Sequence, residues 1–248
     1  MTGICSNLEW DSNFFGYRIA RINGRVLTPE SVEQIAVWCN AERIECLYFL
    51  ADADDTQTAR LAEQHRLAFV DMRLTLTAEI TAGSADKSIR ACEPSDIPIL
   101  KSIARISHRA SRFYHDPVFS NNRCDTLFET WIERSCGDFA NVTFVSSEGD
   151  EPTGYITCNI LPDGRGQIGL LGVADAHRSK GIGRRLIAAS FAWFRDQGVS
   201  QVEVVTQGRN IAEQRAYQKN GFLTVSVEHW YHWWSAKIFP RPSSDALW

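Results

Sequence analysis

Hydrophobic residues follow two different spacings along this chain, and together they predict a mixed α/β protein. Alternation with a period of two over 17–22, and again over 68–77, is typical of strands with one buried face. The segment 28–39 instead repeats apolar residues at helical spacing, and it begins with Thr-Pro, a favoured N-cap and first helical position. Both spacings recur through most of the chain.

The rest of the chain alternates between predicted strands and helices. Leu8 to Asn23 is expected to form a strand, a turn at Asp11-Ser12-Asn13, and a second strand. Further strands are expected at 46–51, 68–77, 89–92, 142–147, 154–160, 167–173, 201–206 and 222–230. Helices are expected at 28–39, 59–66, 95–107, 124–134, 182–195 and 211–220, with a loop over 109–122.

Composition shifts divide the chain into two predicted domains. Residues 1–80 form a first α/β domain, and 81–88 is a linker that is poor in apolar residues. Residues 89–234 form the second domain, and 235–248 is a polar tail. Residues 59–70 echo 216–223 as a helix followed by a strand, which indicates that the first domain is a partial relative of the second.

Composition also excludes several classes of protein. Hydrophobic residues make up 44%, so the chain can bury a core, and the net charge of −4 argues against a nucleic-acid partner. The seven cysteines include no C-x-x-C and the six histidines no H-E-x-x-H, so no metal site is predicted. Neither a signal peptide nor an apolar run of about 18 residues is present. We therefore expect a cytoplasmic protein without a membrane span.

One stretch, His177 to Gly183, combines features of an anion site. It follows the apolar run 168–173 and opens the predicted helix at 182–195. The first N–H groups of a helix lack internal partners and lie at the positive end of its dipole, and glycine lets a phosphate approach the backbone. This turn is therefore predicted to hold the pyrophosphate of a cofactor.

Two common nucleotide motifs fit this turn poorly. A dinucleotide fingerprint needs a third glycine, but Leu186 stands there, and Glu203 lies inside the next strand rather than at its end. A P-loop needs lysine after its second glycine, whereas Lys180 precedes Gly181.

The wider pattern resembles the GNAT superfamily of acyl-CoA N-acyltransferases. That family carries R-x-x-G-x-G/A after a strand and, farther on, N-x-x-A-x-x-x-Y-x-x-x-G-F. Here Arg178, Gly181 and Gly183 match the turn, while Asn210 and Tyr217 match the second pattern together with Gly221-Phe222. The resemblance covers about 89–234. It implies the GNAT fold, a central mixed and mostly antiparallel sheet flanked by helices, with acetyl-CoA as co-substrate and no metal.

The resemblance also implies a role for each site residue. The pyrophosphate is expected on Arg178, Ser179, Lys180, Gly181, Ile182, Gly183 and Arg184, with Lys180, Arg184 and Arg185 available to the 3′-phosphate. The pantetheine arm is expected along Leu171, Gly172 and Val173 and on Asn210, which as an alternative could only cap its helix. Tyr217 is expected to be the general acid, since a phenol of pKa about 10 can protonate a leaving thiolate of pKa about 8.5. Its alternative is a packed core tyrosine.

No residue is selected as the base that deprotonates the incoming amine. Glu203, Glu148, His108 and His115 are all available, and water is a further alternative.

The acceptor site is predicted from the segment after the first helix of the second domain. Ser111-Arg112-Phe113 and Trp131-Ile132-Glu133, with 168–171 and 206–207, are similar to bacterial dTDP-4-amino-4,6-dideoxygalactose N-acetyltransferases. That similarity implies a sugar-nucleotide acceptor, which would be bound by Arg112, Phe113, Tyr114 and Trp131. Internal pairing of Arg112 and core packing of the aromatic residues form the alternative.

Three classes of function follow. The first is acetylation of an amino-sugar nucleotide in surface polysaccharide biosynthesis. The second is acetylation of a protein, a peptide or another small-molecule amine, and the third is non-catalytic acyl-CoA binding. The oligomeric state, including a homodimer, is left open.

Overall fold

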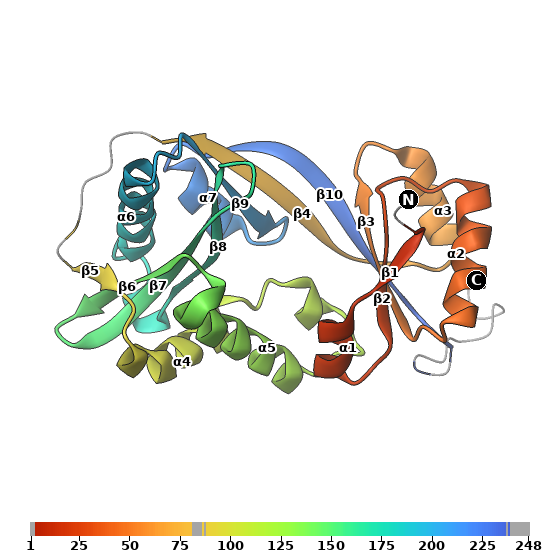
Figure 1. Cartoon of the computed structure of the whole chain (residues 1–248), viewed down its shortest axis with the longest axis horizontal. Helices are drawn as coiled ribbons and strands as arrows, with labels where there is room; N and C mark the ends of the chain where they lie inside the picture. Colours follow the sequence, from red (N-terminus) through yellow and green to blue (C-terminus); the bar gives the residue numbers. More distant parts are fainter. Residues whose placement is uncertain (1–2, 81–85, 87, 237, 239–248) are drawn as a thin grey trace. The chain divides into compact units, whose positions relative to one another are not determined.

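The computed structural model describes residues 3–80, 86, 88–236 and 238, and its elements follow the predicted alternation (Figure 1). The strands are β1 Cys5–Asn7, β2 Ile19–Ile22, β3 Cys46–Asp52, β4 Ala68–Glu79, β5 Ile89–Ala91, β6 Val142–Glu148, β7 Glu151–Ile160, β8 Gly166–Val173, β9 Gln201–Gln207 and β10 Leu223–Trp234. The α-helices are α1 Glu9–Phe15, α2 Pro29–Ala41, α3 Thr56–Gln64, α4 Ile97–Ser107, α5 Asn121–Arg134, α6 Ile182–Asp196 and α7 Ile211–Gln218. Short helical turns lie at Pro94–Asp96, Arg112–His115, Ser135–Phe139 and Asp175–His177. Parts of the predicted linker and tail, 81–85, 87, 237 and 239–248, lie outside the described residues.

The described strands form one mixed sheet in the order β1-β2-β3-β10-β4-β9-β8-β7-β6-β5. The pairs β2–β3 and β8–β9 are parallel, whereas β1–β2, β3–β10, β5–β6, β6–β7 and β7–β8 are antiparallel. This mixed and mostly antiparallel sheet with flanking helices confirms the predicted α/β class.

The chain divides into two compact units that cut across the predicted domain boundaries. The first unit contains 1–73, 115–120 and 227–248, and the second contains 74–114 and 121–226. The physical reason is that β4 and β10 are long strands, and each runs from one unit into the other. The first unit therefore includes the end of β10, and the second includes the end of β4.

The first unit is organised around α2, which begins as predicted after Thr28 but runs two residues farther, to Ala41; of its predicted buried face, Ala36 is exposed. Thr28 accepts a hydrogen bond from the backbone N–H of Ser31, and Ser31 accepts one from Thr28 in return. Val32, Ile35 and Cys39 are buried against β2 and β3 in the core of this unit. The succession β2-α2-β3-α3-β4 has the same order of element types as the later succession β8-α6-β9-α7-β10.

The predicted turn at Asp11-Ser12-Asn13 is wrong, because α1 occupies it. The hydroxyl of Ser12 donates to the carbonyl of Leu8 at 2.7 Å, and Trp10 stacks on Phe14 one turn later, with ring centroids 5.1 Å apart. Gly16 then ends the helix with a φ of 79°. Pairing of aromatic side chains four residues apart outweighs the turn preference of the short polar cluster.

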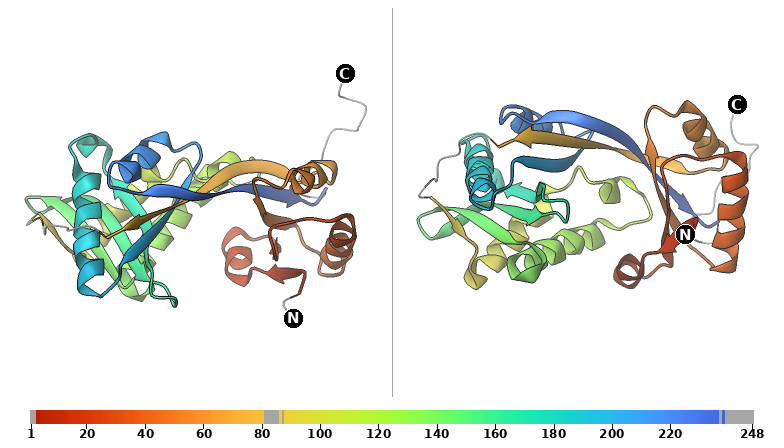
Figure 2. Two further views of the ribbon diagram at one scale, coloured as in Figure 1. Left: turned by 90° about the horizontal axis from the view of Figure 1, so that it is seen from above. Right: turned by 45° about the horizontal axis from the view of Figure 1, so that its top comes forward.

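The second unit places its helices on opposite faces of the sheet. Along β7, Gly154 faces Ile182 and Leu186 of α6, whereas the next residue, Tyr155, bonds to His108 at the end of α4. Successive strand residues point to opposite faces, so α6 covers one face and α4 with α5 the other (Figures 1 and 2). The predicted core positions Ile182, Leu186 and Ala189 of α6 are buried, while Trp193 is only half-buried.

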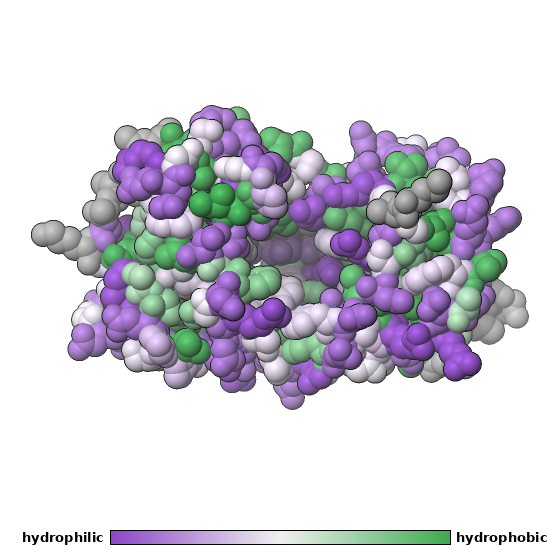
Figure 3. Space-filling view, in the orientation of Figure 1, coloured by the Kyte–Doolittle hydropathy of each residue, from purple (hydrophilic) through white to green (hydrophobic). Residues whose placement is uncertain are grey.

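Hydrophilic residues cover most of the face of the protein seen in Figure 3, and hydrophobic side chains gather there only in small groups. Of the helices in the described part of the chain, none is both long and apolar enough to span a bilayer.

The contact between Gly172 and Tyr155 leads to a first prediction. A Cβ added at Gly172 would lie 2.6 Å from Cε1 of Tyr155, whose side chain is fully buried. Gly172→Ala is therefore expected to lower the free energy of unfolding by about 1–3 kcal/mol, as measured by urea titration.

The matched control for Gly172→Ala is Gly183→Ala on α6. A Cβ there meets no atom within 4 Å, and Gly183 has no positive φ. This variant is expected to keep or gain up to about 1 kcal/mol of stability, because alanine favours helices over glycine. Equal losses of stability in both variants would show that a clash with the Tyr155 ring is not the cause of the loss in Gly172→Ala.

Candidate functional site

The turn between β8 and α6 leaves the helix N-terminus open. Ser179 and Gly181 both have left-handed backbones, with φ of 63° and 78°. Gly181 is the N-cap, none of the described side chains caps this end, and the first turn carries no acidic residue. The first N–H groups of α6 are thus available to an anion, as the sequence predicted.

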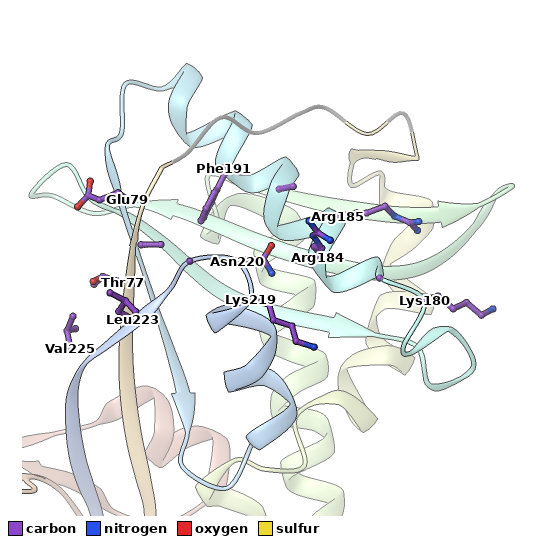
Figure 4. Close-up of a pocket in the computed structure, with 14 residues that line it drawn as sticks. Thr77, Glu79, Lys180, Arg184, Arg185, Phe191, Lys219, Asn220, Leu223 and Val225 are labelled. Carbon is purple, nitrogen blue, oxygen red and sulfur yellow. The ribbon is translucent and has the colours of Figure 1, made fainter.

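A groove of about 950 Å³ begins at this turn and carries four cationic side chains. Lys180, Arg184 and Arg185 come from the turn and the start of α6, and Lys219 comes from just beyond α7. Figure 4 places Arg184 between α6 and the end of α7, where Lys219 and Asn220 lie. The groove also has an apolar part, formed by Ala78, Ala188, Phe191, Leu223 and Val225.

The cations of the turn differ in their partners. Arg178 pairs with Asp175 at 2.9 Å, and Arg185 lies 3.4 Å from Asp86. Lys180 and Arg184 are exposed on the groove. They are therefore the cations best placed for a further anionic group.

The three predicted pantetheine residues lie where β8 has separated from β9. The parallel ladder pairs Gly166 with Val202 and ends at Ile168 and Val204, although β8 continues to Val173 and β9 to Gln207. Leu171, Gly172 and Val173 pair only with β7 on their other side. The edge of β8 that faces β9 is thus open to an extended ligand.

Asn210 caps the N-terminus of α7, which is the alternative role given to it in the sequence analysis. Its side-chain oxygen accepts from the N–H of Glu213 at 3.3 Å, and its amide nitrogen donates to the Glu213 carboxylate at 2.5 Å. The contact of Asn210 with a pantetheine arm stays a prediction, since its side chain is already bonded on both atoms.

Tyr217 lies in the core beside an acid that sequence reasoning missed. Its side chain is only 1% exposed, and its hydroxyl donates to the Glu213 carboxylate at 3.4 Å. Burial, and then the Glu213 charge, raise the pKa of Tyr217 well above its usual value, and burial also raises the pKa of Glu213. Glu213 stands three residues after Asn210, where the N-x-x-A pattern has alanine, and that departure was the available signal.

The candidate bases have different surroundings in the structure. Glu203 pairs with Arg165 and bonds to Gln167 near the start of β8, away from the open ends of the strands. Glu148 is exposed beside His177. His108 contacts Tyr155, which pairs with Gly172 of the predicted pantetheine strand.

His108 shares a hydrogen bond of 2.8 Å between its Nε2 and the hydroxyl of Tyr155. Its ring also stacks on Phe128 with centroids 4.7 Å apart. Burial lowers the pKa of His108 to about 4, so the imidazole is neutral at physiological pH and can accept a proton.

The predicted acceptor residues belong to one aromatic cluster on α5 and the turn Arg112–His115. Trp131 packs edge-to-face on buried Phe113 at 6.2 Å, and the hydroxyl of Tyr114 donates to Asp125 at 2.7 Å. The guanidinium of Arg112 lies 4.2 Å from the centre of the Phe113 ring. These contacts fit the packing alternative, and substrate binding by the four residues stays a prediction.

Within the described part of the chain, no three histidine, cysteine, aspartate or glutamate side chains gather as metal ligands do.

Protonation of His108 should cost stability in acid. The unfolded state takes up its proton near pH 6.5 and the folded state only near pH 4, so between these values the unfolded state binds more protons. Stability is therefore expected to fall by about 3 kcal/mol as pH drops from 6.5 to 4.

The measurement for this prediction is urea unfolding across that pH range. His108→Phe keeps a ring on Phe128 but does not titrate, so its stability should fall less with acid than that of the wild type. Parallel curves for the two proteins would show that His108 contributes nothing to acid sensitivity.

Comparisons with known proteins bear on the family and the fold. Residues 104–222 match the sequence profile of the acetyltransferase (GNAT) family. The spore coat polysaccharide biosynthesis protein SpsD of Bacillus subtilis (strain 168) is 27% identical over 145 residues, which are 58% of this chain and 50% of that protein. A mycothiol acetyltransferase of Propionibacterium freudenreichii subsp. shermanii is 33% identical over 139 residues, which are 53% of this chain and 42% of that protein.

The fold is shared with a solved GCN5-related N-acetyltransferase from Sphaerobacter thermophilus. That structure has a TM-score of 0.66 and 16% identity, and the match covers 93% of this chain and 76% of the other. This chain therefore has the GNAT fold. It spans half or less of the length of the curated relatives that it matches.

Proposed function

We propose that this chain, which has the GNAT fold, is an N-acetyltransferase that carries the acetyl group of acetyl-CoA to a primary amine. The acceptor we propose is the 4-amino group of a dTDP-linked amino-dideoxy sugar, used in surface polysaccharide biosynthesis. One observation carries the proposal. A single unit combines an uncapped, cation-flanked helix N-terminus, a strand edge released from pairing, and the hydroxyl of Tyr217 on the next helix.

The donor site follows from this combination. The N–H groups at Gly181 to Arg184 bind the pyrophosphate, and the cations of Lys180 and Arg184 bind the 3′-phosphate. The groove's apolar part, which includes Phe191 and Leu223, suits the face of an adenine ring. The released edge of β8 at Leu171 to Val173 bonds to the pantetheine amides as a neighbouring strand would.

Acetyl-CoA supplies a thioester, whose carbonyl carbon takes the nitrogen of a neutral amine while its C–S bond breaks. Backbone N–H groups near Leu171 polarise the carbonyl oxygen. Tyr217 gives its hydroxyl proton to the departing sulfur, so that CoA leaves as a thiol. Neutral His108, through Tyr155, and water are the candidates for taking the amine's proton.

The acceptor proposal has separate support. SpsD is named as a polysaccharide biosynthesis protein, which favours a sugar. Arg112 is a planar cation of the kind that binds a diphosphate, and Trp131 and Tyr114 are aromatic residues of the kind that pack on a base or a sugar ring. The mycothiol acetyltransferase relatives favour a different small-molecule amine, which is our second candidate.

Thiol release from acetyl-CoA tests the reaction. The wild type should release free thiol with a dTDP-4-amino sugar, and Tyr217→Phe should lower kcat by about 100-fold or more, because the leaving thiolate loses its proton donor. Tyr17→Phe, in the first unit, is the control and should keep the wild-type rate. The assay is run against a panel that also contains lysine peptides and other small amines.

Each alternative outcome of this panel has a distinct meaning. Thiol release with lysine peptides alone would exclude the sugar acceptor. Tight acetyl-CoA binding without release for any amine would indicate a non-catalytic binding protein. An unchanged rate in Tyr217→Phe would remove Tyr217 as the acid.

Loss of the groove cations tests the donor site. Lys180→Ala and Arg184→Ala are each expected to raise the KM for acetyl-CoA about tenfold, since one charge-assisted contact is lost. The KM for 3′-dephospho-acetyl-CoA should change much less in the same variants. Arg215→Ala, an exposed cation on α7 outside the groove, should leave both values unchanged. Equal effects on the two donors would exclude a 3′-phosphate contact.

A further inference from the structure

Two cysteines that are far apart in the sequence meet in the second unit. Cys92 follows β5 and Cys136 lies in the helical turn after α5, 44 positions later, yet their Sγ atoms are 3.2 Å apart. Both residues are half-buried. The remaining five cysteines are all buried, namely Cys5, Cys39, Cys46, Cys124 and Cys158. Cys92 and Cys136 are therefore the thiols that a dissolved reagent reaches most easily.

Thr143 on β6 holds the backbone of both segments in place. Its carbonyl accepts from the N–H of Cys92 at 2.8 Å, and its hydroxyl donates at 2.9 Å to the carbonyl of Ser135, the residue before Cys136. Thr143 is itself buried and pairs with Thr157 of β7 within the sheet. Because one residue of the sheet anchors both segments, the fold itself brings the two sulfur atoms together.

The distance between the two sulfur atoms suits bond formation. A disulfide bond is about 2.05 Å long, so sulfur atoms 3.2 Å apart need to approach by only about 1 Å. Small rotations of the two side chains supply a shift of this size. The thiols can therefore join without a rearrangement of β6.

The pair lies at the end of a helical hairpin. The helices α4 and α5 lie side by side (Figure 1), and Lys101 pairs with Glu133 at 2.8 Å while Arg105 pairs with Glu129 at 3.2 Å. These pairs run in opposite directions along the two helices, so the helices are antiparallel. The start of α4 and the end of α5 thus lie together, next to the cysteines. A bond between the two sulfur atoms would close this hairpin into a covalent loop.

We propose that Cys92 and Cys136 form a redox-active pair, which small-molecule disulfides convert into a reversible disulfide bond. One cysteine thiolate attacks a sulfur of the reagent R–S–S–R, the S–S bond breaks, and one R–S⁻ leaves and takes up a proton. The second cysteine thiolate then attacks the cysteine sulfur of this mixed disulfide, and a second R–S⁻ leaves. The two cysteines are oxidised, and the reagent is reduced to two R–SH. Formation of this bond does not depend on the proposed acetyl transfer.

Thiol counting with oxidised glutathione as the reagent tests the pair. After incubation of the folded protein and removal of the reagent, titration in urea should show that the wild type has lost two of its seven thiols. Dithiothreitol should restore both thiols. Peptide mass mapping without reduction should find Cys92 joined to Cys136. Cys92→Ser and Cys136→Ser should each form no such bond, and the remaining cysteine should carry one glutathione instead.

The control for this experiment is Cys5→Ala in the first unit. Cys5 and Cys39 belong to the same buried core, so they are the other pair that could account for a loss of two thiols. Cys5→Ala should still lose two thiols to oxidised glutathione. A loss that disappears in Cys5→Ala and persists in Cys92→Ser would overturn the proposal.

A second readout follows the stability of the fold. Oxidation should raise the midpoint of urea unfolding of the wild type by about 1 M, because the bond closes a long loop in the unfolded chain. The double variant Cys92→Ser with Cys136→Ser should show no such rise.

Three results would contradict the redox-active pair. The first is a wild type that keeps all seven thiols, and the second is one that collects only mixed disulfides with glutathione. The third is a urea midpoint that fails to rise when the bond has formed, because such a bond would strain the native fold. None of these results bears on acetyl transfer, which the release of thiol from acetyl-CoA tests separately.

Discussion

An extra residue in β8 creates the opening on which the candidate site depends. Between the pairs Ile156–Leu171 and Cys158–Ile168, β8 advances by three residues while β7 advances by two. At this bulge the N–H of Leu170 donates to the hydroxyl of Thr157 at 2.8 Å instead of continuing the ladder. A bulge bends the strand that carries it, and pairing of β8 with β9 ends at the same place. The bend therefore frees the strand edge that leads to the turn before α6.

The helices α2 and α6 each follow a strand of a parallel pair, but only α2 has a side-chain cap at its N-terminus. At α2, Thr28 and Ser31 satisfy each other's backbone groups, and Pro29 has no N–H to offer. At α6, Gly181 has no side chain with which to cap, and no acid lies in the first turn. The same succession of elements thus gives a closed helix end in one unit and a receptive one in the other. Capping chemistry, rather than topology, separates them.

Local signals in the sequence predicted most of the second unit and part of the first. The start of α2 follows from Thr28-Pro29, and the open turn at α6 follows from its glycines. By contrast, α1 depends on a contact between Trp10 and Phe14 that competes with turn chemistry. The passage of β4 and β10 between units is non-local, because it is decided by pairing between strands far apart in sequence.

The same distinction applies to the site residues. The matches at Asn210 and Tyr217 predict a functional role for α7, but their spacing carries no information about side-chain partners. The contacts of Glu213 could not be predicted from the sequence, because they depend on the fold bringing Thr206, seven residues earlier, and Tyr217, four residues later, to its carboxyl group. The aromatic acceptor candidates likewise could not be divided into packing and binding residues, because both uses need the same side chains at the same spacing.

The burial of Tyr217 sets the cost of the acid chemistry proposed for it. A phenol whose pKa lies well above its ordinary value of about 10 is a poor donor to a thiolate whose thiol has a pKa of about 8.5, and each unit of difference costs about 1.4 kcal/mol. Burial is the largest cause of that raised pKa, and the charge of Glu213 comes next. The proposed proton transfer therefore requires the departing sulfur to lie within hydrogen-bond reach of the hydroxyl, because only a direct transfer between the two atoms can offset this cost.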